Sequence, residues 1–291
     1  MRFPAILCIL LLIWPTIGRA DPAKEFIEEL PTGQINWSKG LLIAKGLGAP
    51  IGNTSQAASN SNQLTQLAHH KAVSNLMETL KGLRLDASHN VAQVLASNEP
   101  FQAKLTQMTA GAQIIHETRL ADGSVEVTVQ MPLLGGFLQM MLPDEIRQVE
   151  PIKPVNAKGS VTQPSWDSPL SEATPKREGI YSGLVVDARG IGAKPAMVSL
   201  IVDEGGKEVY GSAFISREYA VQYGVCEYVR AMPDPGLNPR VAPKPLAARG
   251  LRILPERSCD IVISNTDAAK LRDASANLGF LKQCRVVIII D

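Results

Sequence analysis

The sequence predicts an α+β protein with two domains, each a small, mainly antiparallel sheet packed with helices. Three observations carry this prediction. Apolar residues occupy every second position in several short stretches of both halves, as in half-buried strands. One long stretch has apolar residues at helical spacing. Six prolines between positions 143 and 175 separate the halves, and proline disfavours helix and sheet interiors. The expected segments are a signal peptide (1–20), a first domain (26–142), a Pro-rich linker (143–178) and a second domain (179–291).

The first twenty residues have the order of a cleavable signal peptide. Arg2 precedes a short apolar run at 5–14, and small residues lead up to Ala20. A membrane-spanning helix needs about 20 apolar residues, roughly twice the length of this run. We therefore predict export, with cleavage between Ala20 and Asp21. The alternative is a retained single-pass anchor.

Charge and cysteine placement narrow the expected location and partners. The chain has 29 basic and 28 acidic residues, a balance that offers no basic face for nucleic acid or anionic lipid. Cys8 lies inside the apolar run rather than after the cleavage site, so we do not expect a lipid anchor. No later segment is apolar enough to span a bilayer. We expect a periplasmic protein, either free or held peripherally at the outer membrane.

The first domain is expected to begin with a strand at residues 34–47, where apolar residues alternate and Trp37 packs into the sheet. A helix at 55–81 should follow. Its apolar stripe recurs about every four residues and defines the buried face. That stripe consists of Leu64, Ala68, Ala72, Leu76 and Leu80.

A second, shorter helix around residues 91–95 should stop before Pro100. The domain then ends in a hairpin, because residues 113–120 and 124–131 read as strands on either side of Asp122-Gly123. One face of this hairpin is apolar, and we expect it to lie under the long helix.

The second domain shows several strand patterns and two short helices. Its last strand is apolar on both faces, which indicates a central position in the sheet. Residues 203–206, Asp-Glu-Gly-Gly, supply a turn between two strands. The expected strands are 181–187, 197–202, 207–213, 260–264 and 286–290, and the expected helices lie at 216–223 and around 268–271.

Three cysteines follow the predicted signal peptide, and an oxidising compartment permits one disulfide among them. Cys259 and Cys284 each stand just before a strand-like run. If those strands are neighbours, the two sulfur atoms meet at one end of the sheet, so a Cys259–Cys284 bridge is the pairing we expect. The alternative is three buried thiols, including Cys226, with no bond.

The sequence contains no catalytic, cofactor-binding or metal-binding constellation that we recognise. The Gly-x-Gly pairs lack the third glycine and the following helix of a dinucleotide site. No histidine pair has metal-ligand spacing, and no Gly-x-Ser-x-Gly elbow occurs. We therefore predict no catalytic residue, no cofactor and no metal, and we expect a protein that is not an enzyme.

Three carboxylates leave an alternative open. Asp187, Asp203 and Glu204 lie near strand ends, and paired carboxylates can hydrolyse glycosidic bonds. A periplasmic hydrolase or glycan-binding protein would bring them together in one pocket. Turn chemistry and an ion pair between Asp187 and Arg189 explain the same residues without catalysis. A further alternative is a small-molecule site between the domains, which requires a cleft lined by both.

The first domain resembles a known kind of envelope domain. The strand GQINWSKGLLIAKGLGAP, the helix QLAHHKAVSNLMETLKGLRLDA and the hairpin end DGSVEVTVQMPL are similar to the LPP-twenty-like family of small bacterial outer-membrane lipoproteins. They also resemble the N-terminal domain of flagellar assembly protein T. The second domain, with YSGLVVDARGIGAKPAM and CDIVISNTDAAKLRD, resembles uncharacterised periplasmic proteins of the same wider group.

This resemblance implies a structural or assembly role in the envelope, associated with the outer membrane or the flagellar base. The chain departs from the lipoproteins because it lacks their lipidated cysteine. Together with the missing catalytic motifs, the resemblance favours a non-enzymatic periplasmic protein that binds protein partners or associates with itself. Nucleic acid is not expected as a partner.

Overall fold

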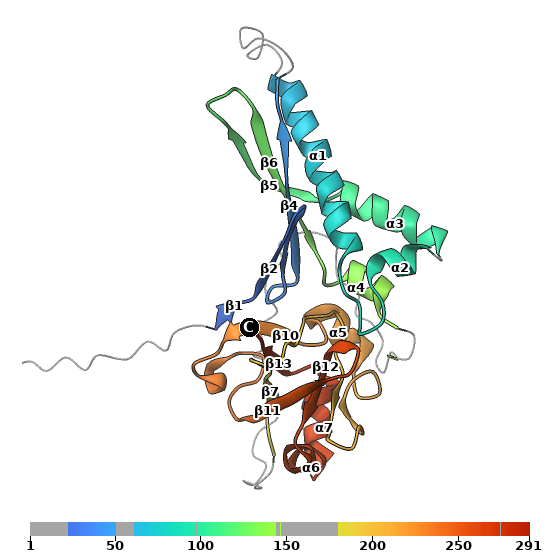
Figure 1. Cartoon of the computed structure of the whole chain (residues 1–291), viewed down its shortest axis with the longest axis vertical. Coiled ribbons are helices and arrows are strands. Elements are labelled where there is room, and N and C mark those ends of the chain that lie inside the picture. Colours follow the sequence, from blue (N-terminus) through green and yellow to red (C-terminus); the bar gives the residue numbers. More distant parts are fainter. Residues whose placement is uncertain (1–22, 51–60, 97, 144–145, 147–179, 274) are drawn as a thin grey trace, which may run out of the picture.

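The chain folds into two lobes stacked along its longest axis (Figure 1). This computed structural model describes residues 23–50, 61–96, 98–143, 146, 180–273 and 275–291. Each lobe consists of a single sheet with helices packed against it. The predicted α+β class is therefore confirmed. The predicted signal peptide with its Ala20–Asp21 cleavage site lies outside the described residues, as does nearly all of the predicted linker.

The first lobe is built on a five-stranded antiparallel sheet in the order β2-β3-β4-β6-β5. The predicted hairpin is confirmed: β5 and β6 pair around Asp122 and Gly123. Gly123 supplies a positive φ of 83°, and the backbone N–H of Ser124 donates to Asp122 Oδ1 at 2.9 Å. The strands are β2 (Ile27–Leu30), β3 (Gly33–Asn36), β4 (Leu41–Gly48), β5 (Gln113–Arg119) and β6 (Val125–Pro132).

Helix α1 (Ser61–Lys81) covers one face of this sheet along β4 and β6. All five residues of the predicted stripe are buried. The helix lies unusually close to β4, because a Cβ atom at Gly46 or Gly48 would overlap the α1 backbone at Ala68, Ala72 or Leu64. Two glycines therefore set the distance between the layers, and α1 and the sheet form one block.

One prediction for the first lobe was wrong, and one helix was not predicted. The strand expected at 34–47 is a hairpin of β3 and β4, because the chain turns back at Gly40, whose φ is 62°. The second helix, α2 (Val91–Ala96), ends before Pro100 as predicted. A further helix that was not predicted, α3 (Glu99–Ala110), then begins with Pro100 in its first turn, where the backbone N–H that proline lacks would have no helical partner. A short helix, α4 (Gly136–Met141), follows β6.

The second lobe holds an eight-stranded sheet in the order β1-β10-β13-β7-β11-β12-β8-β9. It is mixed, since four of its seven pairings are parallel and three are antiparallel. The strands are β1 (Lys24–Glu25), β7 (Gly183–Asp187), β8 (Ile201–Val202), β9 (Glu208–Tyr210), β10 (Glu227–Ala231), β11 (Pro245–Leu254), β12 (Arg257–Ile263) and β13 (Val286–Ile289).

The last strand is central, as its composition predicts: β13 lies between β10 and β7, and all four of its residues are buried. The turn at 203–206 joins β8 to β9 with Gly206 at a φ of 81°. A second Pro-rich stretch, residues 233–245, contains a short 3-10 helix (Pro235–Leu237) and runs into β11, a strand that the sequence analysis does not predict. The helices of this lobe are α5 (Arg217–Tyr223), α6 (Asn265–Arg272) and α7 (Ser275–Lys282).

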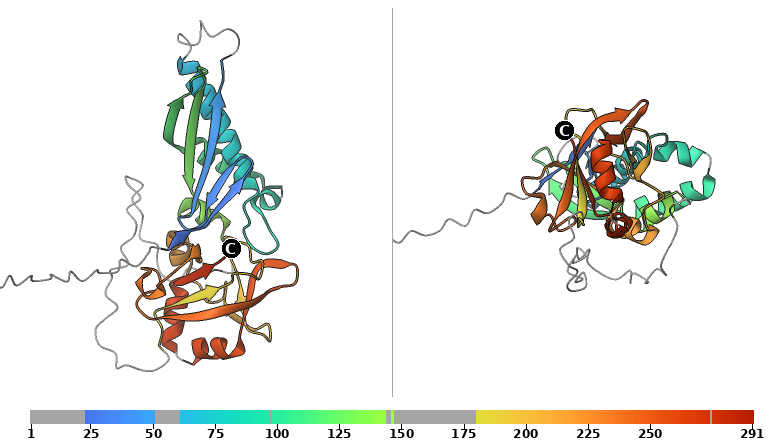
Figure 2. Two further views of the ribbon diagram at one scale, coloured as in Figure 1. Left: turned by 60° about the vertical axis from the view of Figure 1, so that its left-hand side comes forward. Right: turned by 90° about the horizontal axis from the view of Figure 1, so that it is seen from below.

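The two lobes share strand β1 and one hydrophobic core. Strand β1 precedes the first lobe in sequence, yet it pairs antiparallel with β10 at the edge of the second sheet. Buried side chains of both lobes belong to one continuous apolar cluster. Figure 2 shows β1 and the C-terminus at the junction between the lobes. The first lobe is therefore tied to the second at its N-terminal end as well as through the linker.

Candidate functional site

The three predicted carboxylates do not converge. Strand β8 runs opposite to β7, because β7 is parallel to β11, β11 is antiparallel to β12, and β12 is parallel to β8. Asp187 is the last residue of β7, and Asp203 directly follows β8. Because these strands run in opposite directions, the two residues lie at opposite ends of the strands. Glu204 follows Asp203 and accepts a hydrogen bond from the Asn265 backbone N–H at 2.9 Å. This geometry does not provide the shared pocket that a carboxylate hydrolase needs.

Asp187 and Asp203 each form an ion pair with an arginine. Asp187 accepts from Arg189 at 2.6 and 2.8 Å, and Asp203 accepts from Arg272 at 2.8 Å. In both cases the hydrogen bond from the guanidinium lowers the pKa of the carboxyl group. Both groups are therefore ionised at neutral pH, whereas a general acid needs a raised pKa. The predicted ion pair between Asp187 and Arg189 is confirmed.

The hollow beside Asp187 lies at the carboxyl ends of parallel strands, where ligands bind in many α/β proteins. Its volume is about 700 Å³, and it is wide open to solvent. Its walls carry two arginines and one aspartate but no aromatic side chain. The lining residues are Asp187, Arg189, Gly190, Ala247, Ala248 and Arg249.

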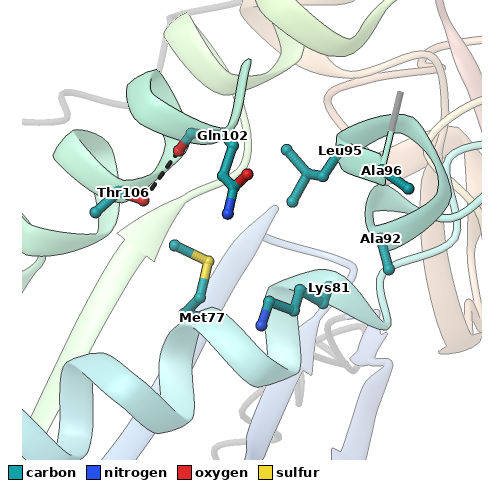
Figure 3. A pocket seen from close by; sticks show the side chains of 7 residues that line it. All are labelled: Met77, Lys81, Ala92, Leu95, Ala96, Gln102 and Thr106. Atoms are coloured by element: carbon teal, nitrogen blue, oxygen red, sulfur yellow. Dashed lines mark hydrogen bonds between the residues drawn. The ribbon is translucent and has the colours of Figure 1, made fainter. Parts of the chain in front are cut away.

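A second hollow of about 320 Å³ lies between α1, α2 and α3 (Figure 3). Met77 and Leu95 give it an apolar floor, while Lys81, Gln102 and Thr106 stand at its rim. Lys81 is engaged by Glu78 at 2.6 Å, and the Thr106 hydroxyl donates to the Gln102 carbonyl at 2.9 Å. Each of these two hollows draws on one lobe alone, so neither provides the inter-domain site that a small-molecule module requires.

The junction between the lobes is bonded closely through Arg84. Its guanidinium donates to both carboxylate oxygens of Glu28 at 2.7 and 2.9 Å and to the carbonyl of Pro195 in the second lobe at 2.7 Å. Two backbone hydrogen bonds also connect the lobes. The N–H of Met197 donates to the Arg84 carbonyl at 3.0 Å, and the N–H of Val198 donates to the Leu85 carbonyl at 2.8 Å. We call this junction the seam.

Trp37 packs at the seam rather than inside the first sheet as predicted. Its ring meets Tyr228 of the second lobe edge to face at 5.8 Å, and its Nε1–H donates to Glu28 at 2.8 Å. The neighbouring Ser38 hydroxyl donates to the Tyr228 carbonyl at 2.5 Å. The phenol of Tyr228 in turn bonds Ser199 at 2.6 Å. Aromatic packing and hydrogen bonds thus fix the same contact.

Arg217 closes the other side of the seam. Its guanidinium donates to four carbonyl oxygens at 2.8–3.3 Å, all at the end of the first lobe: Gln139, Leu142, Pro143 and Ile146. The backbone N–H of Gly135 also donates to the Val221 carbonyl at 2.8 Å, which joins α4 to α5. Polar groups are paired on both sides of the seam. The two lobes are therefore fixed against each other and do not form a cleft that opens at a hinge.

The opposite end of the first lobe is different. Strand β5 is the edge of its sheet, and within the described residues it pairs with β6 alone. Ile114 and Ile115 on this strand are 45% and 44% exposed, and Leu120 directly after it is 41% exposed. We call residues 113–120 the distal edge. An edge strand leaves backbone N–H and C=O groups unpaired on its outer side, and the two exposed isoleucines lie beside them.

Exposed apolar side chains are concentrated in this part of the molecule. Eight large apolar side chains of the described residues are exposed, and five belong to β4, α1 or the distal edge. The remaining three are scattered over the second lobe at Leu237, Leu251 and Leu278. Among the described residues, the first lobe therefore exposes more large apolar side chains than the second.

The predicted Cys259–Cys284 disulfide is not formed. Cys259 lies on β12 and Cys284 stands just before β13, but β7 and β11 lie between these two strands. The condition on which the prediction depended, that the strands be neighbours, is not met. Cys226, Cys259 and Cys284 are all free thiols.

The described residues contain no group of three His, Cys, Asp or Glu side chains arranged to hold a metal ion. Within the same residues, no helix combines the length and the apolar character that crossing a membrane demands.

Sequence reasoning missed the seam and the distal edge. Arg84 and Arg217 gave no local signal, because both act on partners far away in the sequence. Trp37 was noticed as one of few tryptophans, but its partner could not be named. The apolar pattern of residues 113–120 was visible. Its position at a sheet edge depends on strand order, which no local pattern encodes.

One comparison with known proteins matches the second lobe. The family model described as Treponema pallidum Tp0624, second domain, matches residues 183–291. The match begins at the first residue of β7, so it leaves out β1 and the whole first lobe. No curated protein matches the chain.

Proposed function

We propose that this chain is an exported, non-enzymatic structural or assembly factor of the bacterial cell envelope, and that it binds protein partners through the distal edge. The observation that carries the proposal is the exposure of Ile114 and Ile115 on an edge strand. A partner segment that adds a strand to β5 would gain backbone hydrogen bonds and cover both isoleucines.

Other features support a binding role over catalysis. The seam makes the two lobes one rigid support, so a load or a partner on the distal edge is held in a fixed position relative to the second lobe. Of the carboxylates considered for hydrolysis, Asp187 and Asp203 are held in ion pairs at opposite ends of the strands, and Glu204 accepts a hydrogen bond from a backbone N–H. On the resemblance of the first lobe, the partners we propose are proteins of the outer membrane or the flagellar base.

The partner test uses two matched surface variants of the full chain. Ile115→Lys alters the distal edge, and Leu251→Lys alters an equally exposed aliphatic position, 44% exposed, on the second lobe. Affinity capture from envelope fractions, with native mass of the complex, should recover the same partner with the wild type and with Leu251→Lys. Ile115→Lys should lower recovery roughly tenfold, as the loss of about 1.4 kcal/mol in binding implies. A monomer without a reproducible partner would contradict the proposal, and so would equal recovery by both variants.

Export has its own test. Sequencing of the N-terminus of protein taken from the periplasmic or outer-membrane fraction should give Asp21 as the first residue. Uncleaved protein held in the inner membrane would contradict this part of the proposal without affecting the distal edge.

A further inference from the structure

An apolar cluster covers part of one face of the second sheet. Side chains of β7, β10 and β13 pack there against residues of the loop between β10 and β11. The members are Val185, Val229, Met232, Val241, Val287 and Ile289. On β11, Ala247 lies opposite Val185 and therefore on the same face, but it is exposed, as is Arg249 two residues later. The cover thus ends at β11, and the hollow beside Asp187 lies there.

A row of three residues crosses this face at the carboxyl ends of parallel strands. Asp187 of β7 lies opposite Ile289 of β13 on one side and opposite Arg249 of β11 on the other. Neighbouring strands are about 4.8 Å apart, so side chains in such a row lie within reach of each other. Ile289 is 6% exposed, whereas Arg249 is open to solvent. The row therefore changes from buried and apolar at β13 to charged and exposed at β11.

Asp187 does not form an ion pair with Arg249. Both oxygens of Asp187 accept from the Arg189 guanidinium, at 2.8 and 2.6 Å. The hydrogen bond from Arg189 is the main cause that lowers the pKa of Asp187, and the charge of Arg249 makes a smaller contribution. Among the residues that the structure describes, none accepts a hydrogen bond from the Arg249 guanidinium or pairs with it directly. Its donors therefore face the hollow unpaired.

A β-bulge places a second arginine on the same face of β11. Two steps along β11, from Gly250 to Arg252, match a single step along β12. Side chains alternate along a regular strand, so Arg249 and Arg252 would point to opposite faces without this extra residue. With it, both lie on the face of Asp187, and re-aiming a side chain beside a site is a common use of bulges. Arg252 is exposed, and within the described ranges it too has no hydrogen-bond or ion-pair partner.

Arg189, the third arginine near the hollow, is already committed to carboxylates. Asp187 raises the pKa of Arg189 through their hydrogen bond, and the charge of Asp291 adds a smaller contribution. The side chain of Asp291 is itself held, because its Oδ2 accepts from the Gly190 backbone N–H at 2.6 Å. An anion that enters the hollow would therefore be held by Arg249 and Arg252 rather than by Arg189.

We propose that the hollow beside Asp187 binds a phosphate monoester, whose phosphate group is held by Arg249 and Arg252. The proposal concerns the second lobe alone and does not depend on binding at the distal edge. A guanidinium donates two parallel hydrogen bonds to a phosphate, and two arginines a few residues apart on one strand can reach the same group. The chain as a whole has 29 basic and 28 acidic residues, so this positive charge is local and does not show in the composition.

The charge and lining of the site select among anions. A phosphate monoester has a second pKa of about 6, so it is largely a dianion at neutral pH and matches two guanidinium groups, whereas a single carboxylate matches one. The volume of about 700 Å³ lies in the range of small-molecule sites. The lining residues carry no aromatic ring on which a nucleobase would stack, so a nucleotide is not the expected ligand.

The test offers the exported protein two phosphate monoesters from different sources. Isothermal titration calorimetry with glycerol 3-phosphate measures binding of a dissolved small molecule. Flotation with phosphatidylcholine vesicles, with and without phosphatidic acid, measures binding of a lipid headgroup. Binding of either probe supports the proposal and identifies the source of the phosphate. Binding of neither probe, or equal flotation with both kinds of vesicle and no calorimetric signal, would overturn it.

Variants of exposed residues locate the site. Arg249→Gln and Arg252→Gln should each weaken binding roughly tenfold or more, because a charge-assisted contact is lost. Arg249→Lys keeps the charge without the planar fork and should weaken binding less than Arg249→Gln. Lys104→Gln removes the same charge from an exposed position on α3 and should leave the affinity unchanged. All four variants should keep the wild-type melting temperature. Equal affinities for Arg249→Gln, Arg252→Gln and Lys104→Gln would contradict the assignment.

Discussion

At the seam, Arg84 of the first lobe donates to the carbonyl of Pro195 in the second lobe at 2.7 Å, and the ring of Trp37 packs against Tyr228. At the distal edge of the same lobe, Ile114 and Ile115 are more than two-fifths exposed beside a sheet edge. One end of the first lobe thus packs against the second lobe, and the other end exposes apolar side chains to solvent.

The seam contains contacts that stabilise the folded chain, whereas the distal edge contains exposed side chains that are available for binding. Apolar side chains at an edge strand contribute little to the stability of the monomer, and their exposure makes association easier. Buried polar groups at the seam contribute through hydrogen bonds that are costly to leave unpaired. Substitutions at the two ends should therefore have opposite consequences: loss of stability at the seam and loss of binding at the distal edge.

The largest effect should come from the layer that supports the distal edge. In Gly46→Ala, the new Cβ overlaps the α1 backbone at Ala68 and Ala72, so helix and sheet must separate. We expect a loss of about 3 kcal/mol or more in the free energy of unfolding, measured by urea denaturation. The same substitution at Gly279, where a Cβ meets nothing within 4 Å, should raise stability by about 0.5–1 kcal/mol. Similar effects at both positions would show that α1 is not packed on β4 as described.

A smaller loss is expected from the seam. Arg84→Ala removes the ion pair with Glu28 and the hydrogen bond to the Pro195 carbonyl. The free energy of unfolding should fall by about 2–3 kcal/mol. Lys45→Ala removes an ion pair with Glu126 whose lysine is 64% exposed, so its effect should stay below about 0.5 kcal/mol. Equal losses in urea denaturation would remove the distinction between the two ends.

Acid should weaken the seam at strand β1. The hydrogen bond from Lys39 is the main cause that lowers the pKa of Glu25 in the folded protein. A folded pKa below the unfolded value of about 4.3 gives stability that is present above that pH and is lost as the pH falls through the folded pKa. Glu25→Gln should therefore flatten the dependence of the melting temperature on pH between about 5 and 3. Lys39→Met should flatten it as well; an unchanged slope in both variants would contradict the role of this pair.

The smallest effect on stability should come from the distal edge itself. Ile115→Lys replaces a side chain that is already 44% exposed, so the free energy of unfolding should change by less than about 0.5 kcal/mol. Leu76→Ala, at a fully buried position under the same sheet, should cost about 2–5 kcal/mol. Thermal denaturation of both variants measures the contrast. If Ile115→Lys also unfolds the protein, the distal edge is part of the core and not a free surface.

Local patterns predicted the parts of the fold that are local. The hairpin around Asp122-Gly123 and the buried stripe of α1 were predicted because turn chemistry and side-chain period act within a few residues. The turn at Gly40 was missed, since Trp37-Ser38-Lys39-Gly40 carries no standard turn pair. The end of α2 before Pro100 was predicted, but α3 was not, although proline is well suited to the first turn of a new helix.

The features that concern function depend on strand order, and a single sequence does not contain it in readable form. The predicted bridge between Cys259 and Cys284 required β12 and β13 to be neighbours, but β7 and β11 lie between them. The separation of Asp187 from Asp203 follows from the same order. The distal edge is exposed only because β5 happens to be the last strand of its sheet.

The most direct test of the proposed role is site-specific photo-crosslinking in the native cells. A photoreactive amino acid at position 115, on the distal edge, is compared with one at position 251, on the second lobe. The account predicts a covalent adduct with one envelope protein from position 115, absent from position 251 and lost when Ile114→Lys is added. No adduct from position 115, or the same adducts from both positions, would contradict it.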